Sequence, residues 1–509
     1  MEFKFPSFQL LFSMFLSLMI LLILIIKKNN KRLPPGPTKL PIIGNLHNLF
    51  FAGDDHLPRV FGELAKKHGT FMHLKFGQIS QVVVSSSDIA KEFLKTHDIN
   101  FATRPDKFTS RLIFYNNRDI ALAPYGEYWK QMKKIVTLEL LSAKKVKSFN
   151  RLRRDEVGKM INILTKAATN GTSVNLSEMF LVSNNNISTR SIFGDNFRHQ
   201  KEFLNAMKVV VDLATSSNFS NFFPLLENFI AWLTGMKLKT EKTHKIIDNI
   251  LNTIIDEHLG KKNNDNSMED GEEDFLDILL KLQKENQFGF EFSINDLKAV
   301  LLDLFPGGTE TTSTTLEWIM SELVKNPTTL KKVTSEVRQK ISITDAKTDD
   351  CDNNFSNEMG YMQNVIKETF RLHPPVPILL PHESREKCQI KGYDIEEKTT
   401  VIVNVWAIGR DPNKWKDPEI FKPERFVGNP INFKGSHFDL IPFGSGRRIC
   451  PGMTFGLSNV ELSLATLLYN FDWKIPNDVP GKDLDMAESL RGTLGRKNPL
   501  ILIPVFPTT

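Results

Sequence analysis

The sequence is poor in several features that define common classes of protein. It holds only three cysteines, Cys351, Cys388 and Cys450, a sparse and odd set that excludes a disulfide scaffold and favours a reducing compartment. Its 65 basic and 59 acidic residues leave a net charge of +6 without a long basic block, so we expect no nucleic-acid partner. No Gly/Ser-rich linker or internal repeat divides residues 40–509, and we expect one large domain there.

Tyrosine and tryptophan are also scarce, with six of each, whereas phenylalanine occurs 38 times. Phenylalanine adds a large apolar surface without a polar tip, so this bias predicts an apolar interior that encloses an apolar cavity. The shares of hydrophobic residues (41%) and charged residues (24%) are those of ordinary globular proteins. This composition excludes a disordered or collagen-like chain.

The one long apolar run lies near the N-terminus. From Phe5 to Ile26 there is no charged residue, and about 20 apolar residues suffice for a helix to span a bilayer. Four basic residues follow the run: Lys27, Lys28, Lys31 and Arg32. By the positive-inside rule, they place the body of the chain on the cytoplasmic side. A cleaved signal peptide would end in small residues, which are missing here, and a buried core helix is the other alternative.

We therefore predict three segments. Residues 1–28 form a transmembrane anchor, residues 29–40 a basic and proline-rich hinge, and residues 41–509 the folded domain. Within that domain, apolar residues recur at helical spacing over 274–282 and 297–323. Runs of β-branched residues over 81–85 and 399–403 predict short strands, and residues 261–274 predict an exposed polar loop. The fold class is mainly α with a minor β subdomain.

Residues 443–452 read Phe-Gly-Ser-Gly-Arg-Arg-Ile-Cys-Pro-Gly and are the most distinctive segment. Three glycines and a proline predict a tight loop, and an apolar-striped helix over 453–469 follows it. At the start of that helix, backbone N–H groups and the helix dipole would favour the thiolate form of Cys450. With no second Cys or His nearby, this thiolate suits an axial ligand of one iron better than a zinc site. A buried structural cysteine is the alternative.

The pattern Phe443-x-x-Gly446-x-Arg448-x-Cys450-x-Gly452 resembles the haem-binding signature of cytochrome P450 monooxygenases. The resemblance extends over almost the whole chain and is closest to plant microsomal A-type members. It implies the cytochrome P450 fold, haem b as cofactor and Cys450 as the axial ligand of its iron. It also implies that Phe443 packs beside the thiolate, that Gly446 and Gly452 belong to the loop, and that Arg448 binds a haem propionate.

Further segments fit the same family. The Glu368-x-x-Arg371 pair would be an ordinary surface ion pair on its own, but the resemblance implies a buried pair joined by Arg425 of a Pro-Glu-Arg-Phe segment. Trp129 and Lys133 fit a Trp-x-x-x-Arg motif whose members reach the propionates, although a lysine stands where arginine is usual. His382 also occupies a place where relatives commonly carry arginine, and we expect it in the cofactor site.

Residues 306–312 read Pro-Gly-Gly-Thr-Glu-Thr-Thr within a long helical pattern that Asn326-Pro327 ends. These are poor helix formers, so we expect a local distortion, for which a merely kinked packing helix is the bland alternative. In the family this is the helix that covers the oxygen site. The resemblance implies that Glu310 and Thr311 form the acid–alcohol pair that relays protons to oxygen. Pro306 departs from the small residue that is usual there.

The resemblance also places the substrate pocket, which is apolar over 376–379 and implies a lipophilic substrate. The residues expected to line it are Phe114, Leu304, Gly308, Val376, Ile378, Leu379 and Arg491. We favour a terpenoid (a diterpene or sesquiterpene), with phenylpropanoids and alkaloids as alternatives. The resemblance implies that electrons come from NADPH through a flavoprotein reductase in the endoplasmic reticulum membrane. No dinucleotide-binding Gly-rich fingerprint follows a predicted strand, so we expect that the chain does not bind NADPH itself. A haem carrier without oxygen chemistry, and an isomerase or dehydratase, are the other function classes.

Overall fold

The computed structural model describes Ser13, Ser17 and residues 32–50, 56–195, 197–215, 219–264, 273–285, 292–343 and 359–507. The predicted anchor and the residue Cys351 therefore lie outside the described residues, apart from the two serines. Within the described part of the chain, no helix combines the length and the apolarity needed to cross a bilayer.

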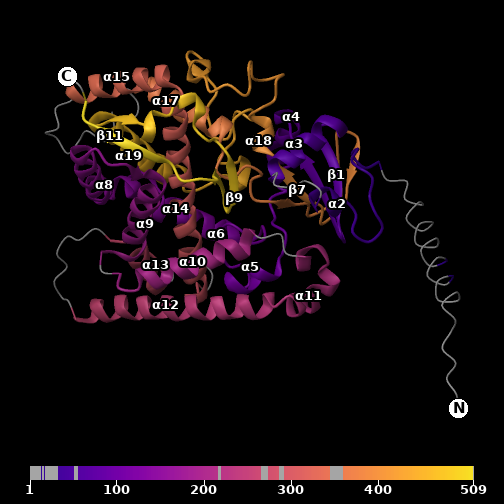
Figure 1. The fold of residues 1–509 in the computed structure, drawn as a ribbon. Coiled ribbons are helices and arrows are strands. Elements are labelled where there is room, and N and C mark those ends of the chain that lie inside the picture. The colour runs from indigo at the N-terminus through magenta and orange to yellow at the C-terminus, as the bar shows by residue number, and fades with distance from the viewer. Residues whose placement is uncertain are drawn as a thin grey trace, which may run out of the picture.

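Helices make up most of the described chain (Figure 1). The α-helices of the N-terminal half are α2 (Leu46–Phe50), α3 (Leu57–His68), α4 (Ser87–Lys91), α5 (Phe108–Ile113), α6 (Glu127–Ile135), α7 (Ala143–Ser148), α8 (Asn150–Asn170), α9 (Leu176–Phe193), α10 (Gln200–Thr215), α11 (Glu227–Leu233) and α12 (Met236–Asn264). Those of the C-terminal half are α13 (Phe275–Glu285), α14 (Ile294–Lys325), α15 (Pro327–Ile343), α17 (Gly360–Leu372), α18 (Val405–Ile408) and α19 (Met453–Asn470).

The strands are short and fall into small sheets. They are β1 (Phe71–Phe76), β2 (Ile79–Val84), β3 (Val174–Asn175), β4 (His382–Glu383), β5 (Cys388–Ile390), β6 (Tyr393–Ile395), β7 (Thr400–Val403), β8 (Asp472–Lys474), β9 (Glu488–Arg491), β10 (Thr493–Arg496) and β11 (Ile501–Val505). The largest sheet has the order β1-β2-β7-β4, and β2 pairs with β7 in parallel although the two are far apart in sequence. Both predicted strand segments lie in it, as β2 and β7.

The helix α14 passes through the middle of the molecule, with α9 packed along it and α19 close by (Figure 1). Its start is fixed by a capping box, in which the Ser293 hydroxyl accepts from the N–H of Asp296 and the Asp296 carboxylate accepts from the N–H of Ser293. It ends at Lys325, before Asn326-Pro327, as the sequence predicts. Two large apolar clusters form most of the core; one includes the first half of α14 and the other its second half.

Pro306 lies inside α14, which runs as one helix from Ile294 to Lys325, so the distortion expected there does not end the helix. Beside it, the hydroxyls of Thr309 and Thr311 donate to the carbonyls of Phe305 and Gly307, 3.0 and 2.7 Å away.

One local expectation needs correction. The expected exposed loop over 261–274 is too long at both ends. The helix α12 extends to Asn264, and Asp274 is buried, where its carboxylate accepts from the N–H of Asp277 at 2.8 Å.

Candidate active site

The cysteine loop turns sharply before α19. The N–H of Cys450 donates to the carbonyl of Phe443 at 3.0 Å, which closes the loop. Gly446 has φ +69°, and a Cβ on it would lie 2.3 Å from the carbonyl oxygen of Leu94. No residue other than glycine fits such a left-handed turn against a neighbouring backbone. The loop therefore presents the half-buried Cys450 to the interior in one fixed position.

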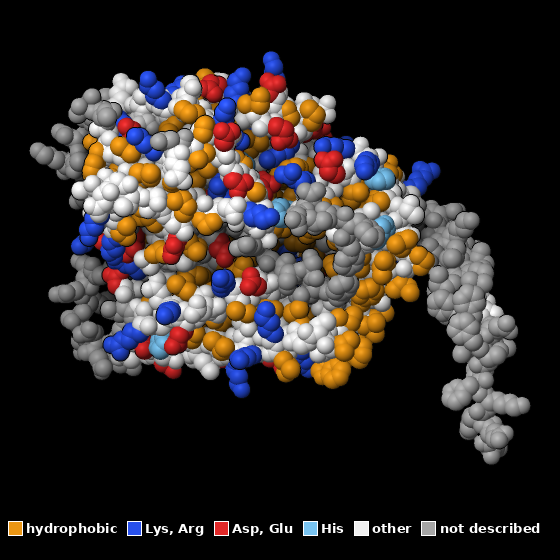
Figure 2. Space-filling model, in the orientation of Figure 1, with side chains coloured by type: hydrophobic (Ala, Val, Ile, Leu, Met, Phe, Trp, Pro, Cys, Tyr) orange, Lys and Arg blue, Asp and Glu red, His pale blue; other side chains and the backbone are white. Residues whose placement is uncertain are grey.

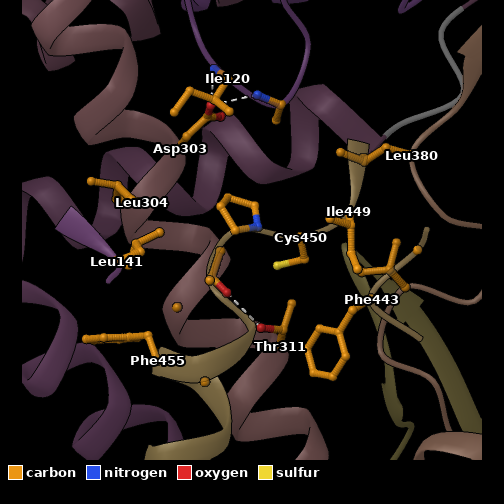
Figure 3. Close-up of a pocket in the computed structure, with 18 of the residues that line it drawn as sticks. Ile120, Leu141, Asp303, Leu304, Thr311, Leu380, Phe443, Ile449, Cys450 and Phe455 are labelled. Carbon is orange, nitrogen blue, oxygen red and sulfur yellow. Dashed lines mark hydrogen bonds between the residues drawn. The ribbon is translucent and has the colours of Figure 1, made fainter. Parts of the chain in front are cut away.

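The thiol of Cys450 lines a cavity of about 330 Å³ between the cysteine loop and α14 (Figure 3). Burial raises the pKa of this thiol, whereas the N–H of Gly452 and the ammonium group of Lys133 lower it. The cavity wall is mainly apolar; the residues Ile120, Val136, Leu141, Ile192, Phe275, Leu304, Val376, Leu379, Phe443, Ile449 and Phe455 contribute to it. Such a wall suits a large, flat and mostly apolar group.

Three cations gather on one side of this cavity. Arg448 donates to the carbonyls of Ala102 and Ile120, at 2.6 and 3.1 Å, and to that of Ala123, and its guanidinium lies 4.1 Å from the centre of the Trp129 ring. The two other cations, Arg104 and Lys133, also donate to carbonyl groups. The ion pairs of the described residues include none of the three, although the nearby carboxylate of Asp119 acts on Arg104 and Arg448, and that of Asp303 acts on Arg448.

This charge arrangement indicates what the cavity binds. Burial, with the neighbouring cations as a smaller cause, lowers the pKa of Arg448 to about 9 and that of Lys133 to about 8, and burial lowers the pKa of Arg104 to about 10. Buried cations that are not paired with an acid are costly, so the site favours an anion. A haem fits all of these features, because its propionates are carboxylates, its ring is flat and apolar, and its iron accepts a thiolate.

Two further residues expected in the cofactor site also line the cavity. The indole N–H of Trp129 donates to the carbonyl of Ile120 at 3.0 Å, so its ring is held beneath Arg448. In His382, Nδ1 contacts the carbonyl of Phe101 at 2.8 Å. Burial, and then Arg104 and Arg448, lowers the pKa of His382 well below its usual value, so this imidazole is neutral at physiological pH.

Arg104 is a cavity residue that the sequence reasoning missed. It lies 7% exposed, and its guanidinium donates to the carbonyls of Ala121, Leu380 and Pro381, at 3.0, 2.7 and 2.8 Å. No local motif marks it, because its partners come from distant parts of the chain. Asp303 was missed for the same reason, although it lies on α14 and also lines the cavity.

On α14, the acid–alcohol pair points in two directions. Thr311 lines the cavity on the same side as Gly307, Gly308 and Thr312, whereas Glu310 is not among the lining residues. The Glu310 carboxylate lies at the tip of the β9–β10 hairpin, where a Cβ on Gly492 would be 2.9 Å from Oε2 of Glu310. Burial, and then Asp212, raises the pKa of Glu310 to about 7. The pair thus connects the cavity with the region next to α10.

Behind the cysteine loop, Glu368, Arg371 and Arg425 form one ion cluster. Arg371 donates to Glu368 through Nε at 2.7 Å and through a terminal nitrogen at 2.8 Å, and Arg425 Nε donates to it at 2.9 Å. The side chains of Glu368 and Arg371 are fully buried. Arg371 also donates to backbone carbonyls of the 409–420 segment, so the cluster ties this segment to α17.

Only part of the expected substrate contacts meet at the cavity. Leu304, Gly308, Val376 and Leu379 line it. Phe114 and Ile378 are not among the lining residues: Phe114 directly follows α5 and is buried in the larger core, and Ile378 packs beside the first sheet. The side chain of Arg491 lies outside what the structure describes.

A single thiol aimed into an apolar cavity whose side carries unpaired cations defines a haem-thiolate protein. The chain belongs to the cytochrome P450 family, whose family model (Cytochrome P450) matches residues 34–503. Haem is accordingly its cofactor. The chain is 45% identical over 506 residues to premnaspirodiene oxygenase of Hyoscyamus muticus, covering 98% of both chains. It is 43% identical over 484 residues to tabersonine 6,7-epoxidase isoform 1 of Catharanthus roseus, covering 94% of this chain and 92% of the relative.

The fold has solved counterparts. A zebra fish cytochrome P450, in a structure with progesterone, superposes with a TM-score of 0.74 at 24% sequence identity, covering 89% of this chain and all of that one. Together with the family match, these similarities make the chain a plant-type cytochrome P450 monooxygenase, a mainly helical protein with small sheets.

Proposed function

We propose that this enzyme inserts one oxygen atom from O2 into a lipophilic plant metabolite, a terpenoid of the diterpene or sesquiterpene class, with electrons from an NADPH-dependent reductase. The observation that carries the proposal is that Cys450 and Thr311 open into one apolar cavity (Figure 3). The thiol provides a ligand for the haem iron and the hydroxyl provides a proton donor on the side where oxygen would react. A carrier without oxygen chemistry would need no such hydroxyl.

The residues of this chain divide the work of the reaction. When bound, the haem supplies the iron at which O2 is activated. Cys450 would hold that iron, and Arg104, Lys133 and Arg448 would hold the propionates by charge-assisted hydrogen bonds. Oriented in this way, the ring would lie between the cysteine loop and α14. The apolar wall would exclude bulk water and hold an apolar substrate by shape.

Proton delivery is the task we assign to Thr311 and Glu310. The Thr311 hydroxyl donates to the carbonyl of Gly307 at 2.7 Å and Thr311 lines the cavity, so rotation of this side chain would turn the hydroxyl toward a ligand there. Glu310 lies on the next position of α14, and its pKa of about 7 lets it take up and release a proton at neutral pH. This division would bring protons from the α10 side of α14 to the cavity.

The terpenoid assignment rests on two supports. The cavity presents apolar side chains from several parts of the chain, among them Leu304, Val376 and Leu379, so apart from the cations assigned to the haem it has few groups with which to recognise a polar molecule. One similar plant enzyme is named for the oxygenation of premnaspirodiene, a diene hydrocarbon. A second candidate substrate class is an alkaloid, because another relative is named a tabersonine epoxidase.

We further propose that the enzyme is held at the endoplasmic reticulum membrane by residues 1–28, through the hinge at 29–40, with the domain at 41–509 facing the cytoplasm. An exposed apolar patch supports membrane contact (Figure 2). It lies over α11 and the segments beside it, and it includes Leu225, Phe229, Trp232, Leu233 and Leu238, each more than half exposed. Burying such side chains in lipid would stabilise the bound state.

The reductase is the proposed protein partner. The exposed Lys134 lies on α6, near the cysteine loop, and its charge suits an acidic surface. Two other cations of this region are already paired within the chain: Lys130 with Glu127 at 3.0 Å, and Arg447 with Asp98 at 2.5 Å. We therefore expect Lys134 to matter more than either of them for the attraction of the reductase.

The experiment is turnover in microsomes that contain the full chain and a plant reductase. Sesquiterpene and diterpene hydrocarbons, alkaloids and phenylpropanoids are supplied separately under ¹⁸O2. The proposal predicts an NADPH-dependent terpenoid product that carries one ¹⁸O atom. A product formed without O2 would indicate an isomerase or dehydratase, and haem binding without NADPH consumption on any substrate would indicate a carrier; either result would refute the proposal.

A further inference from the structure

Residues 114–123, which we call the roof segment, connect α5 with the loop before α6 and cover one side of the cavity. Two of these residues, Ile120 and Ala121, line it directly. Near the start of the segment, three consecutive residues that are not glycine, Tyr115, Asn116 and Asn117, have φ values of +48°, +66° and +56°. Asparagine tolerates such left-handed backbone, but for Tyr115 it is unfavourable and persists only where surrounding contacts impose it.

The contact nearest to the cavity comes from Asp303 of α14. One carboxylate oxygen, Oδ2, accepts from the N–H of Ile120 at 2.6 Å and from the N–H of Ala121 at 2.9 Å (Figure 3). Asp303 itself lines the cavity, and the next residue, Leu304, places an apolar side chain in the same wall. The aspartate therefore fixes the distance between the roof segment and the helix that covers the oxygen site.

The same two residues are held from the other side by the cations of the cavity. Arg104 Nε donates to the carbonyl of Ala121 at 3.0 Å, and a terminal nitrogen of Arg448 donates to the carbonyl of Ile120 at 3.1 Å. The N–H groups of Ile120 and Ala121 thus face an anion, and their carbonyls face cations. Charge-assisted bonds on both sides leave this part of the roof segment little freedom to move.

Two other acids support the segment. Asp119 is fully buried beside Asp303, and its Oδ2 accepts from the N–H of Leu122 at 2.9 Å. Arg118 makes an ion pair with Asp296, which lies earlier on α14 and is absent from the cavity wall. These contacts act at Arg118 and Leu122, whereas the Asp303 carboxylate is the one that accepts from the N–H of Ile120.

From this arrangement we infer that Asp303 is a positioning residue: it sets how far the Ile120 side chain reaches over the haem, and thereby which ligands fit the cavity. The inference rests on the proposed function, because it assumes that haem occupies this cavity. Asp303 acts through the backbone and transfers no proton or atom itself. Release of this contact widens the space over the iron without removing any group that holds the cofactor.

The test compares the binding of two nitrogen ligands to the haem-loaded full chain, followed by the shift of the haem absorption band. 4-Phenylimidazole adds a phenyl ring to imidazole, so on this inference the roof segment limits its binding more than that of imidazole. In Asp303→Asn, we expect the affinity for 4-phenylimidazole relative to imidazole to rise at least fivefold. Ile120→Ala should give the same rise, and the double variant should exceed Ile120→Ala by less than twofold.

Asp296→Asn is the matched control, because it removes an aspartate that braces the same segment from the same helix outside the cavity. We expect its ligand ratio to stay within twofold of the wild type. An unchanged ratio in Asp303→Asn, or an equal rise in Asp296→Asn, would overturn the inference, the second because general loosening would then explain the effect.

Amide hydrogen exchange at residues 120 and 121 provides a readout that needs no haem. Exchange should be at least tenfold faster in Asp303→Asn than in wild type and unchanged in Ile120→Ala. Equal exchange in wild type and Asp303→Asn would overturn the inference even if the variant loses haem. Failure of the wild-type chain to bind haem at all would refute the proposed function instead, and it would leave the exchange result as the test of the Asp303 contact.

Discussion

The buried ion cluster behind the cysteine loop gives the sharpest stability prediction. The Glu368 carboxylate accepts from Arg371 at 2.7 and 2.8 Å, from Arg425 at 2.9 Å and from the N–H of Lys422 at 2.8 Å. In Glu368→Gln the charge is lost while the size is kept, so the fully buried Arg371 guanidinium lacks a counter-charge. Removal of one partner from a buried pair costs about 3–5 kcal/mol.

The loss of stability in Glu368→Gln is a large part of the total free energy of unfolding, which is about 5–15 kcal/mol for single domains. At about 1.4 kcal/mol for each factor of ten, the unfolded population should rise about 100- to 5,000-fold. Urea unfolding, followed by tryptophan fluorescence and by haem absorbance, measures the change. The control is Lys332→Met, which breaks a surface pair with Glu424 whose side chains are 52% and 41% exposed, and which should cost about 0–1 kcal/mol. A stability loss of only about 0–1 kcal/mol in Glu368→Gln, the size expected for the control, would refute the reasoning.

Three further predictions concern turnover and cofactor binding. Thr311→Ala should release hydrogen peroxide in place of product at similar NADPH consumption, and full coupling in this variant would contradict a proton-relay role. Because Glu310 is protonated below its pKa of about 7 and ionised above it, product per NADPH should fall as pH rises through 7. Asp212→Asn should move this fall to lower pH, since Asp212 raises the Glu310 pKa, and an unmoved midpoint would count against the assignment. Arg104→Gln should weaken haem retention by about 10- to 100-fold, as expected for the loss of one hydrogen bond to a charged group; transfer of haem to apomyoglobin measures this. In the control Arg447→Gln, the arginine already pairs with Asp98, so haem retention should stay within about threefold of the wild type.

The sequence predicts best those features whose causes are local. The tight loop around Cys450 follows from its glycines and proline, and the bounds of α14 follow from the Ser293 cap and from Asn326-Pro327. The family resemblance adds the pairing of Glu368 with Arg371 and Arg425, whose spacing alone is typical of many surface helices. The mainly helical class with small sheets is likewise visible from periodicity, and the family match confirms the fold.

The remaining features depend on contacts between distant segments, which spacing does not encode. Arg104 meets the carbonyls of Leu380 and Pro381 only after the chain has folded, so its place beside the cofactor cavity has no local signal. Asp303 looks like an ordinary polar position of a helix until its bonds to Ile120 are seen. Glu310 points away from the cavity because of how α14 is rotated about its axis, which the motif does not specify. Phe114, which the resemblance places in the pocket, follows α5 and is not among the residues that line the Cys450 cavity.

The central claim is that Cys450 ligates a haem iron as a thiolate. The most direct test is the carbon monoxide difference spectrum of the reduced full-length protein in microsomes, with Cys450→Ala and Cys388→Ala measured beside it. We predict the strongly red-shifted Soret band of a thiolate-ligated haem in the wild type and in Cys388→Ala, and its loss in Cys450→Ala. A band at the position of histidine-ligated haem, or a red-shifted band that survives in Cys450→Ala, would contradict this account.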